Sequence, residues 1–353
     1  MKIYLYDPKK SVSFHMEHGP LVDDITFEPS LKKGNFTFLN KKVSSLFGAP
    51  AFVLTMDSRW TTILSRLGYD IITYKTVRSR GWPANAHPNW MYVDIPMQLS
   101  ERELDIPVIG SFEPLRSQEI STANSFGVPS QKPELWQQDF EIAKKNLREG
   151  QMMILSLMCS PIEGKTLVDD AETLGKLAIQ TTADAFEINF ACPNTDSHGL
   201  IYEDVTLTIQ ICKKLKEVLG DRPLLAKVGY YKDPESLKRF IKESQGLISG
   251  ISSTNTFSMK VVDTEGNSAF GEKRSTAGVA GGAIRNLAIK QIDRIMEYKK
   301  EMGQHDLVVL AIGGVTEPRH IQEYLDKGVN AVQGASAVWQ NPYIARQYKE
   351  KYL

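Results

Sequence analysis

Short apolar runs alternate with longer amphipathic segments along most of the chain. The runs are rich in β-branched residues, as is typical of strands, and the longer segments repeat apolar residues at helical spacing. This alternation indicates parallel βα units. It predicts strands at residues 51–55, 70–75, 152–158, 185–190, 223–228, 247–253, 307–313 and 331–336, and helices at 57–67, 134–148, 165–181, 203–219, 233–244, 283–302, 317–328 and 338–350.

These predicted units favour a (β/α)8 barrel, the TIM barrel fold of the α/β class. An open, doubly wound sheet would also alternate strands with helices, but eight consecutive units over about 300 residues fit the closed barrel better. Continuously apolar strands suit a sheet that is buried on both faces. Residues 1–50 are mixed and polar, so we expect an N-terminal extension packed on a barrel of residues 51–353.

Two predicted connections are longer than is usual between packed elements. Residues 76–133 follow the second strand, and residues 254–282 follow the sixth. Loops after the strands of such a barrel lie on its catalytic face. We therefore expect both connections to lie near a substrate.

The composition, with 42% hydrophobic and 24% charged residues, is that of an ordinary globular protein. Lys+Arg and Asp+Glu both number 42, so no overall field attracts nucleic acid or an anionic membrane. No apolar run approaches the roughly 20 residues that span a bilayer, and the first residues lack a signal-peptide core. The cysteines, Cys159, Cys192 and Cys212, show no CxxC spacing for a disulfide framework or a metal. We expect a reduced, cytoplasmic protein without a metal site.

A thiol between two amides ends the fourth predicted strand, in the sequence Asn-Phe-Ala-Cys-Pro-Asn from Asn189 to Asn194. Each amide offers a donor and an acceptor, which suits the alternating C=O and N–H groups of a uracil-type ring. Cys192 could then act as a nucleophile or a general base. Alternatively, Cys192 is a small buried hydrophobe and the residues after it form a turn.

Two lysines lie in predicted strands: Lys75 closes the second, and Lys227 lies inside the apolar fifth. A buried, unpaired ammonium is costly, so an anion is expected near it. One candidate is an ion pair of Lys227 with Glu187. The other is a cofactor that becomes negative on reduction, which would account for both lysines.

Small residues end the last strands, with glycines at 313–314, the Gly-Ala-Ser sequence at 334–336 and a further glycine pair at 281–282. Glycines let backbone N–H groups approach an anion closely, and the loops after strands seven and eight commonly bind phosphate in this barrel. A single such pair would be read as a turn. Together, they predict a phosphate site.

Further polar residues follow the sixth strand, at Thr254, Asn255 and Thr256, and end the long second loop, at Asn124. Each could be an ordinary loop residue. With Asn189 and Asn194, however, the sequence places four asparagines on one face of the barrel.

Together, these motifs resemble the dihydroorotate dehydrogenase family from about residue 50 to the C-terminus, and Asn-x-x-Cys-Pro-Asn is the most specific of them. In that family FMN is bound in the barrel. The resemblance implies that Cys192 and Lys227 are catalytic, that Lys75, Asn124, Asn189, Asn194, Asn255 and Thr256 bind the substrate, and that Lys75, Thr76, Asn189, Lys227, Thr254, Gly282, Gly313, Gly314, Ala335 and Ser336 bind FMN.

The cysteine resembles the soluble class of the family, since the membrane-linked, quinone-using class has serine there. The implied reaction oxidises dihydroorotate to orotate in pyrimidine biosynthesis, with Cys192 as the base and hydride transfer to flavin N5. Soluble relatives form homodimers and pass electrons to fumarate or to a partner subunit. Three cysteines are too few for this chain to hold an iron–sulfur cluster of its own as well.

The chain departs from the family pattern mainly near the predicted substrate. In residues 80–90 the arginine that ends the family's Gly-Asn-Pro-x-Pro-Arg stretch is missing, and residues 94–119 look like an insertion. An FMN-dependent dehydrogenase or reductase of another dihydropyrimidine or cyclic amide is therefore an alternative. Less favoured are a flavin-free, phosphate-binding lyase or isomerase, in which Lys227 forms a Schiff base, and a non-catalytic flavin-binding barrel.

Overall fold

Eight parallel strands close into a barrel in the computed structural model, which describes residues 5–21, 32–95, 98–114, 120–191 and 200–353. Each strand pairs in parallel with the strands before and after it in the chain, and the last pairs with the first. This confirms the predicted (β/α)8 fold. The strands are β3 (Phe47–Ala49), β4 (Ile71–Val77), β8 (Met152–Leu157), β9 (Ala185–Asn189), β10 (Leu224–Val228), β11 (Gly250–Ser253), β14 (Val308–Ile312) and β15 (Ala331–Gln333).

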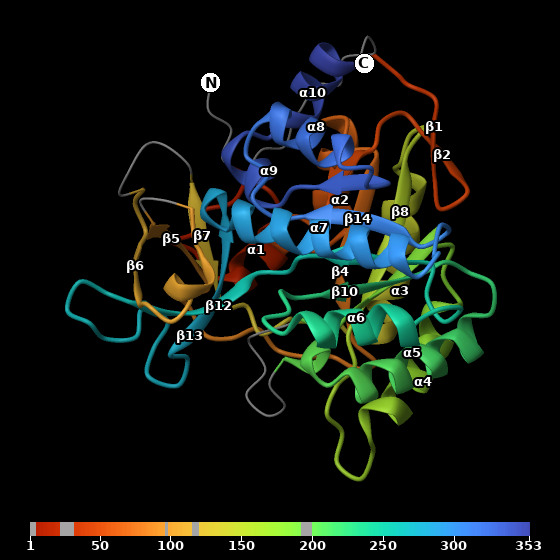
Figure 1. Cartoon of the computed structure of the whole chain (residues 1–353). Helices are drawn as coiled ribbons and strands as arrows, with labels where there is room; N and C mark the ends of the chain where they lie inside the picture. The colour runs from red at the N-terminus through yellow and green to blue at the C-terminus, as the bar shows by residue number, and fades with distance from the viewer. Residues whose placement is uncertain (1–4, 22–31, 96–97, 115–119, 192–199) are drawn as a thin grey trace.

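Helices cover the outside of the barrel (Figure 1). They pack apolar faces on the outward side chains of the strands, such as Phe186 and Val309, in one large core cluster. The helices are α2 (Ser58–Arg66), α3 (Pro133–Lys145), α4 (Leu167–Ala178), α5 (Val205–Leu219), α6 (Pro234–Glu243), α7 (Arg285–Glu301), α8 (Pro318–Asp326), α9 (Ser336–Gln340) and α10 (Ile344–Tyr352).

The first barrel strand is not where the sequence predicted it. Residues 51–55 were expected to be a strand, but β3 ends before them and Val53–Thr55 form a 3₁₀ turn. Gly48 allows β3 to pack closely, because a Cβ there would lie 1.7 Å from the Ile71 carbonyl oxygen. The barrel therefore includes part of the segment expected to be an N-terminal extension.

The predicted last helix, residues 338–350, is also wrong in its extent. It is divided into α9 and α10, which are separated by residues 341–343, with Pro342 in the middle. Proline lacks the N–H group that would continue a helix and clashes with the preceding turn.

The N-terminal segment contributes a helix and a hairpin. The hairpin of β1 (Phe36–Phe38) and β2 (Lys41–Val43) inserts Phe38 and Val43 among the inward side chains of the barrel strands. The helix α1 (Val12–His18) packs near Trp60 through His15. The segment thus both closes one end of the barrel and covers its side.

The two long connections form a second sheet together, which closes on itself into a small five-stranded barrel and which the sequence did not predict. From the first come β5 (Trp90–Asp94), β6 (Val108–Ser111) and β7 (Ser121–Asn124), and from the second β12 (Phe257–Val262) and β13 (Thr276–Gly281). This small sheet stands at one side of the barrel, on the left in Figure 1. It has its own apolar core, which includes Met91, Met259 and Phe270.

Candidate active site

A pocket of about 1020 Å³, part of it open to solvent, lies at the carboxyl ends of the barrel strands. Most of the predicted site residues line it. They are Lys75, Asn124, Asn189, Lys227, Thr254, Asn255, Thr256, Gly313, Gly314, Ala335 and Ser336.

Two predicted cofactor residues do not line this pocket. The Thr76 hydroxyl pairs with Ser156 at 3.0 Å and accepts a long bond from the Asn189 amide at 3.4 Å, so Thr76 supports a lining residue from behind. The Gly282 N–H donates to the Ile120 carbonyl, and it is the adjacent Gly281 that lines the pocket.

Cys192 and Asn194 lie outside the described residues. Ala191, directly before Cys192, lines the pocket. Burial raises the pKa of both other thiols, that of Cys212 to about 12 and that of Cys159 further. Neither Cys159 nor Cys212 lines the pocket, so neither is placed to act as a base there.

The pocket floor follows from the alternation of side chains along the strands. Inward side chains lie two residues apart, so a strand that buries Ala185 inside the barrel also points Asn189 inward at its end. Lys75 lies two residues before the end of β4, and Thr254 and Ala335 lie one and two residues after the ends of β11 and β15. Since parallel strands end together, these side chains converge on one floor.

Lys227 is the most informative residue of the floor. It is 3% exposed, and among the described residues it has no ion-pair partner; the predicted pair with Glu187 does not form. Thr254 lies beside it with a buried hydroxyl that likewise has no hydrogen-bond partner within the described ranges. A buried ammonium and an unsatisfied hydroxyl facing one pocket fit an anionic, hydrogen-bonding ligand.

Backbone N–H groups collect at one end of the pocket. Those of Gly313, Gly314 and Ala335 have no acceptor in the described part of the chain. Gly314 has φ of 67°, and a Cβ there would lie 2.3 Å from the Cβ of Arg285. Only glycine therefore allows this close passage of the chain, and amide groups arranged in this way can bind an anion such as phosphate.

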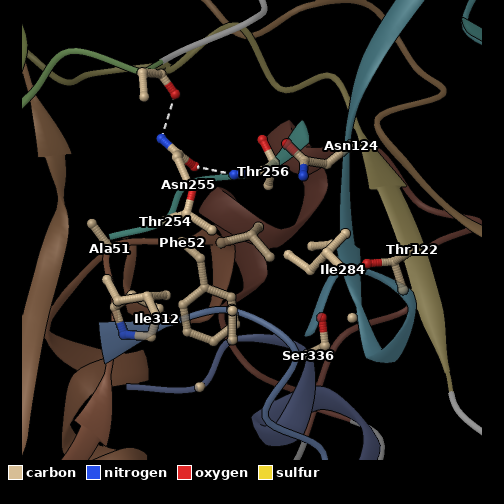
Figure 2. A pocket seen from close by; sticks show the side chains of 18 of the residues that line it. Ala51, Phe52, Thr122, Asn124, Thr254, Asn255, Thr256, Ile284, Ile312 and Ser336 are labelled. Carbon is tan, nitrogen blue, oxygen red and sulfur yellow. Dashed lines mark hydrogen bonds between the residues drawn. The ribbon is translucent and has the colours of Figure 1, made fainter. Parts of the chain in front are cut away.

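Asn189 and Asn255 line the pocket, but most of their side-chain hydrogen bonds are made within the protein. Asn255 Nδ2 donates to Asn189 Oδ1 at 3.2 Å and also to the carbonyl of Ala191. Asn189 Oδ1 accepts from the Ala191 N–H at 3.1 Å. The dashed lines in Figure 2 mark two hydrogen bonds of Asn255, one of which its Oδ1 accepts from the N–H of Thr256 at 2.8 Å. The pair thus holds both backbone groups of the residue before Cys192.

A strained turn follows Asn124 on the far side of the pocket. Val128 has φ of 49°, which is rare for a β-branched residue and typical of functional sites. Among the described residues, no acceptor is found for the N–H groups of Phe126, Gly127 and Val128. Phe126 and Val128 line the pocket. Successive free N–H groups in a turn can bind an anion such as a carboxylate.

The sequence missed several lining residues. Pro50, Ala51, Phe52 and Val53 line the pocket because they follow β3, where a strand was wrongly predicted. Others come from the small sheet or its connections, and the non-local pairing that places them has no sequence signal. They are Trp90, Thr122, Phe126, Val128, Ala280 and Ile284.

The small sheet is held against the barrel by aromatic stacking. The ring of Trp339, in α9, lies 3.8 Å from that of Trp90 and 4.8 Å from that of Tyr92, both in β5. In Figure 2, Asn124 and Thr122 face Phe52 and Ile312 across the pocket. One side of the pocket is therefore barrel and the other is small sheet.

Two kinds of feature are absent from the described residues. No three His, Cys, Asp or Glu side chains within those ranges cluster as metal ligands would. No helix there has the length and apolar character needed to cross a membrane.

Comparison with known proteins decides the family. A family model for dihydroorotate dehydrogenase matches residues 116–352. The chain belongs to the dihydroorotate dehydrogenase family. This confirms the family membership that the sequence motifs predicted.

Relatives within the dihydroorotate dehydrogenase family differ in how much of the chain they match. Dihydroorotate dehydrogenase of Dictyostelium discoideum is 28% identical over 98% of this chain and 96% of its own length. The catalytic subunit of dihydroorotate dehydrogenase B (NAD(+)) of Pyrococcus horikoshii is 26% identical over 46% of this chain and 50% of its own length. Dihydroorotate dehydrogenase A (fumarate) of Lactiplantibacillus plantarum is 26% identical over 47% of this chain and 52% of its own length. The Dictyostelium alignment thus also covers most of the segment before residue 116.

Proposed function

We propose that the protein is an FMN-dependent oxidoreductase that converts dihydroorotate to orotate. The observation that carries the proposal is the buried Lys227, which has no ion-pair partner among the described residues and faces a pocket lined by amides. The names of the relatives in Dictyostelium, Pyrococcus and Lactiplantibacillus support dihydroorotate as the substrate.

The hydrogen-bond donors and the lysines of the pocket suit FMN. The N–H groups near Gly313, Gly314, Ala335 and Ser336 would hold the phosphate, and Lys75 with Lys227 would lie against the ring system. A positive charge there favours the negative charge that arrives on reduction. When bound, FMN supplies the acceptor for the hydride that leaves the substrate.

Cys192 is proposed as the base that removes the proton from the carbon next to the ring carbonyl. Cys192 directly follows Ala191, whose N–H and C=O are held by Asn189 and Asn255. A base held at a fixed backbone position can reach the same proton in each cycle.

The substrate would lie between the barrel and the small sheet. Asn124, Asn255 and Thr256 offer amide and hydroxyl groups to the ring, with Asn194 proposed from the family motif. The N–H groups of residues 126–128, for which the described ranges contain no acceptor, suit a carboxylate, and Lys75 adds a positive charge to the same pocket. These groups would provide local positive potential for the carboxylate in a chain that lacks the family arginine.

A second candidate keeps the flavin and changes the substrate to another dihydropyrimidine or cyclic amide. The substrate side is formed partly by residues near the 94–119 segment, where the chain departs from the family pattern. We also propose that the protein is a cytoplasmic homodimer. It would pass electrons to fumarate or to a partner subunit, since the names of two relatives mention fumarate and a catalytic subunit.

The test is anaerobic titration of the purified protein with dihydroorotate, dihydrouracil and dihydrothymine, following the flavin absorption. Bleaching by dihydroorotate alone is expected. Bleaching by a different ring would favour the second candidate. A colourless protein that does not take up FMN would contradict the flavin proposal and favour a flavin-free barrel in which Lys227 forms a Schiff base.

A further inference from the structure

Below the pocket floor, one layer of the barrel core is polar instead of apolar. Barrel interiors of this fold are filled by layers of four side chains from alternate strands, mostly branched apolar residues. Here one layer is formed by Thr73, Glu187, Ser252 and Gln333, which we call the polar layer. Gln333 Nε2 donates to Thr73 Oγ1 at 2.9 Å, which joins the first and last of its strands.

The strand pairing places the polar layer at one level. Leu225 pairs with Glu187 on one side and with Gly250 on the other. In an eight-stranded barrel of this shear, the level advances by about two residues for every two strands, which brings Ser252 level with Glu187. The same step, repeated around the barrel, connects the other members.

The polar layer contains three buried atoms that have no hydrogen-bond partner in the described part of the chain: Glu187 Oε2, Ser252 Oγ and Gln333 Oε1. All three residues are 0% exposed. The other oxygen of Glu187 accepts from Ser156 at 3.1 Å. Two acceptors and one hydroxyl donor on the barrel axis match a water molecule, which donates twice and accepts from the hydroxyl.

Lys227 lies immediately above this layer. It is the register partner of Ser252 and follows Leu225 by two residues on the inward face of β10. Within the described ranges, neither Lys227 nor Glu187 has an oppositely charged group within 4.0 Å. Two buried charges of opposite sign in one barrel interior stabilise each other strongly, because the dielectric constant there is low.

We propose that Glu187 is a positioning residue for Lys227, acting through water bound in the polar layer. Its carboxylate offsets part of the ammonium charge and holds the ammonium at the pocket floor. That this charge faces a flavin rests on the proposed function, whereas the coupling of the two residues does not.

A double-mutant cycle tests the coupling without any cofactor. In the FMN-free protein, Glu187→Gln and Lys227→Met should each lower the folding equilibrium constant by about a hundredfold or more, since each leaves a buried charge uncompensated. The double variant should lose much less than the product of the two effects. Independent effects that simply multiply would overturn the proposal.

The flavin potential tests the consequence for the site. At a fixed pH of 6, Glu187→Gln should shift the FMN midpoint potential upward, because it removes a negative charge near the flavin. The expected change favours reduced FMN by about tenfold, which is about 30 mV for a two-electron couple. Ser252→Ala, the matched control, removes a neighbouring hydroxyl but no charge. It should change the ratio of reduced to oxidised FMN at a given potential by less than about threefold.

An unchanged potential in Glu187→Gln would reject the role of Glu187 at the flavin. If the wild-type protein takes up no FMN, the proposed function fails, but the double-mutant cycle still decides whether Glu187 and Lys227 are coupled.

Discussion

Asn255 donates a hydrogen bond to the side-chain oxygen of Asn189 at 3.2 Å, and the two together hold the backbone of Ala191. Their amide groups are thus largely used within the protein. Their proposed role is to fix the chain that leads into Cys192, in addition to contacting a substrate.

Loss of this support should impair catalysis more than cofactor binding. We expect Asn255→Ala to lower kcat/KM by about 10- to 100-fold, as a small misplacement of a reacting group can. FMN affinity should change little. Asn286→Ala, an exposed asparagine at the start of α7, is the control. Equal losses in both variants, measured by steady-state kinetics, would refute this role.

Cys192→Ser should retain FMN but slow reduction by substrate at neutral pH by about 10²- to 10⁴-fold. A serine hydroxyl is much less acidic than a thiol, whose ordinary pKa is about 8.5. The rate should therefore recover partly at high pH. Stopped-flow reduction across pH measures this, and unchanged kinetics would remove Cys192 from the mechanism.

Gly314→Ala should abolish FMN binding and destabilise the fold. The left-handed backbone costs an L-residue about 1–2 kcal/mol, and the clash with Arg285 adds about 1–3 kcal/mol. Gly246 has a similar φ of 77° but nothing within 4 Å of an added Cβ, so Gly246→Ala isolates the backbone term. FMN titration and urea unfolding compare the two. If Gly246→Ala behaves like Gly314→Ala, the packing argument is wrong.

The C-terminal helix is anchored by a buried ion pair between Lys349 and Asp70, 2.7 Å apart and at most 3% exposed. Lys349→Met should cost about 3–5 kcal/mol of unfolding free energy, because Asp70 is left buried and charged. Burial raises the pKa of Asp70, so the cost should shrink as the pH falls and the carboxyl becomes protonated.

Lys351→Met, in the exposed part of the same helix, is the control and should stay within about 0.5 kcal/mol of wild type. Urea unfolding at neutral and acidic pH separates the two variants. A pH-independent loss in Lys349→Met would show that packing, and not charge, is responsible.

The N-terminal segment should detach in acid. Burial lowers the pKa of His15, whose ring stacks on Tyr6 at 3.8 Å, although the nearby Asp7 opposes the shift. The detached segment binds a proton more readily, with an ordinary pKa of about 6.5. Docking is therefore fully stable above that pH and is lost as the pH falls below it.

Limited proteolysis at pH 7.5 and 5.5 measures the detachment. His15→Phe should remove the pH dependence, whereas the control His18→Gln, at an exposed histidine of the same helix, should keep it. Persistence of acid sensitivity in His15→Phe would assign it to another group.

The sequence predicted the barrel well because its strands are buried on both faces and its helices have clear periodicity. It failed at β3, where three residues are too short for any period and the adjacent apolar run at 51–55 dominated. The division of the last helix had a signal, Pro342, that the periodic pattern outweighed.

The site was predictable where residues end barrel strands, since the topology alone brings Lys75, Asn189 and Lys227 together. The small sheet was not. Its central pairing joins Asn124 to Gly278, and nothing local in either segment specifies so distant a partner. The mutual bonding of Asn189 and Asn255 was likewise invisible, because a residue type does not reveal where its hydrogen bonds go.

The small sheet has a consequence for redesign. It has its own core and supplies one wall of the pocket, whereas the lysines belong to the barrel. If both long loops are transplanted together into a related barrel, they should transfer their preference for one substrate ring over another. Either loop transplanted alone would leave β7 or β13 without its partner strand, and the wall would be lost.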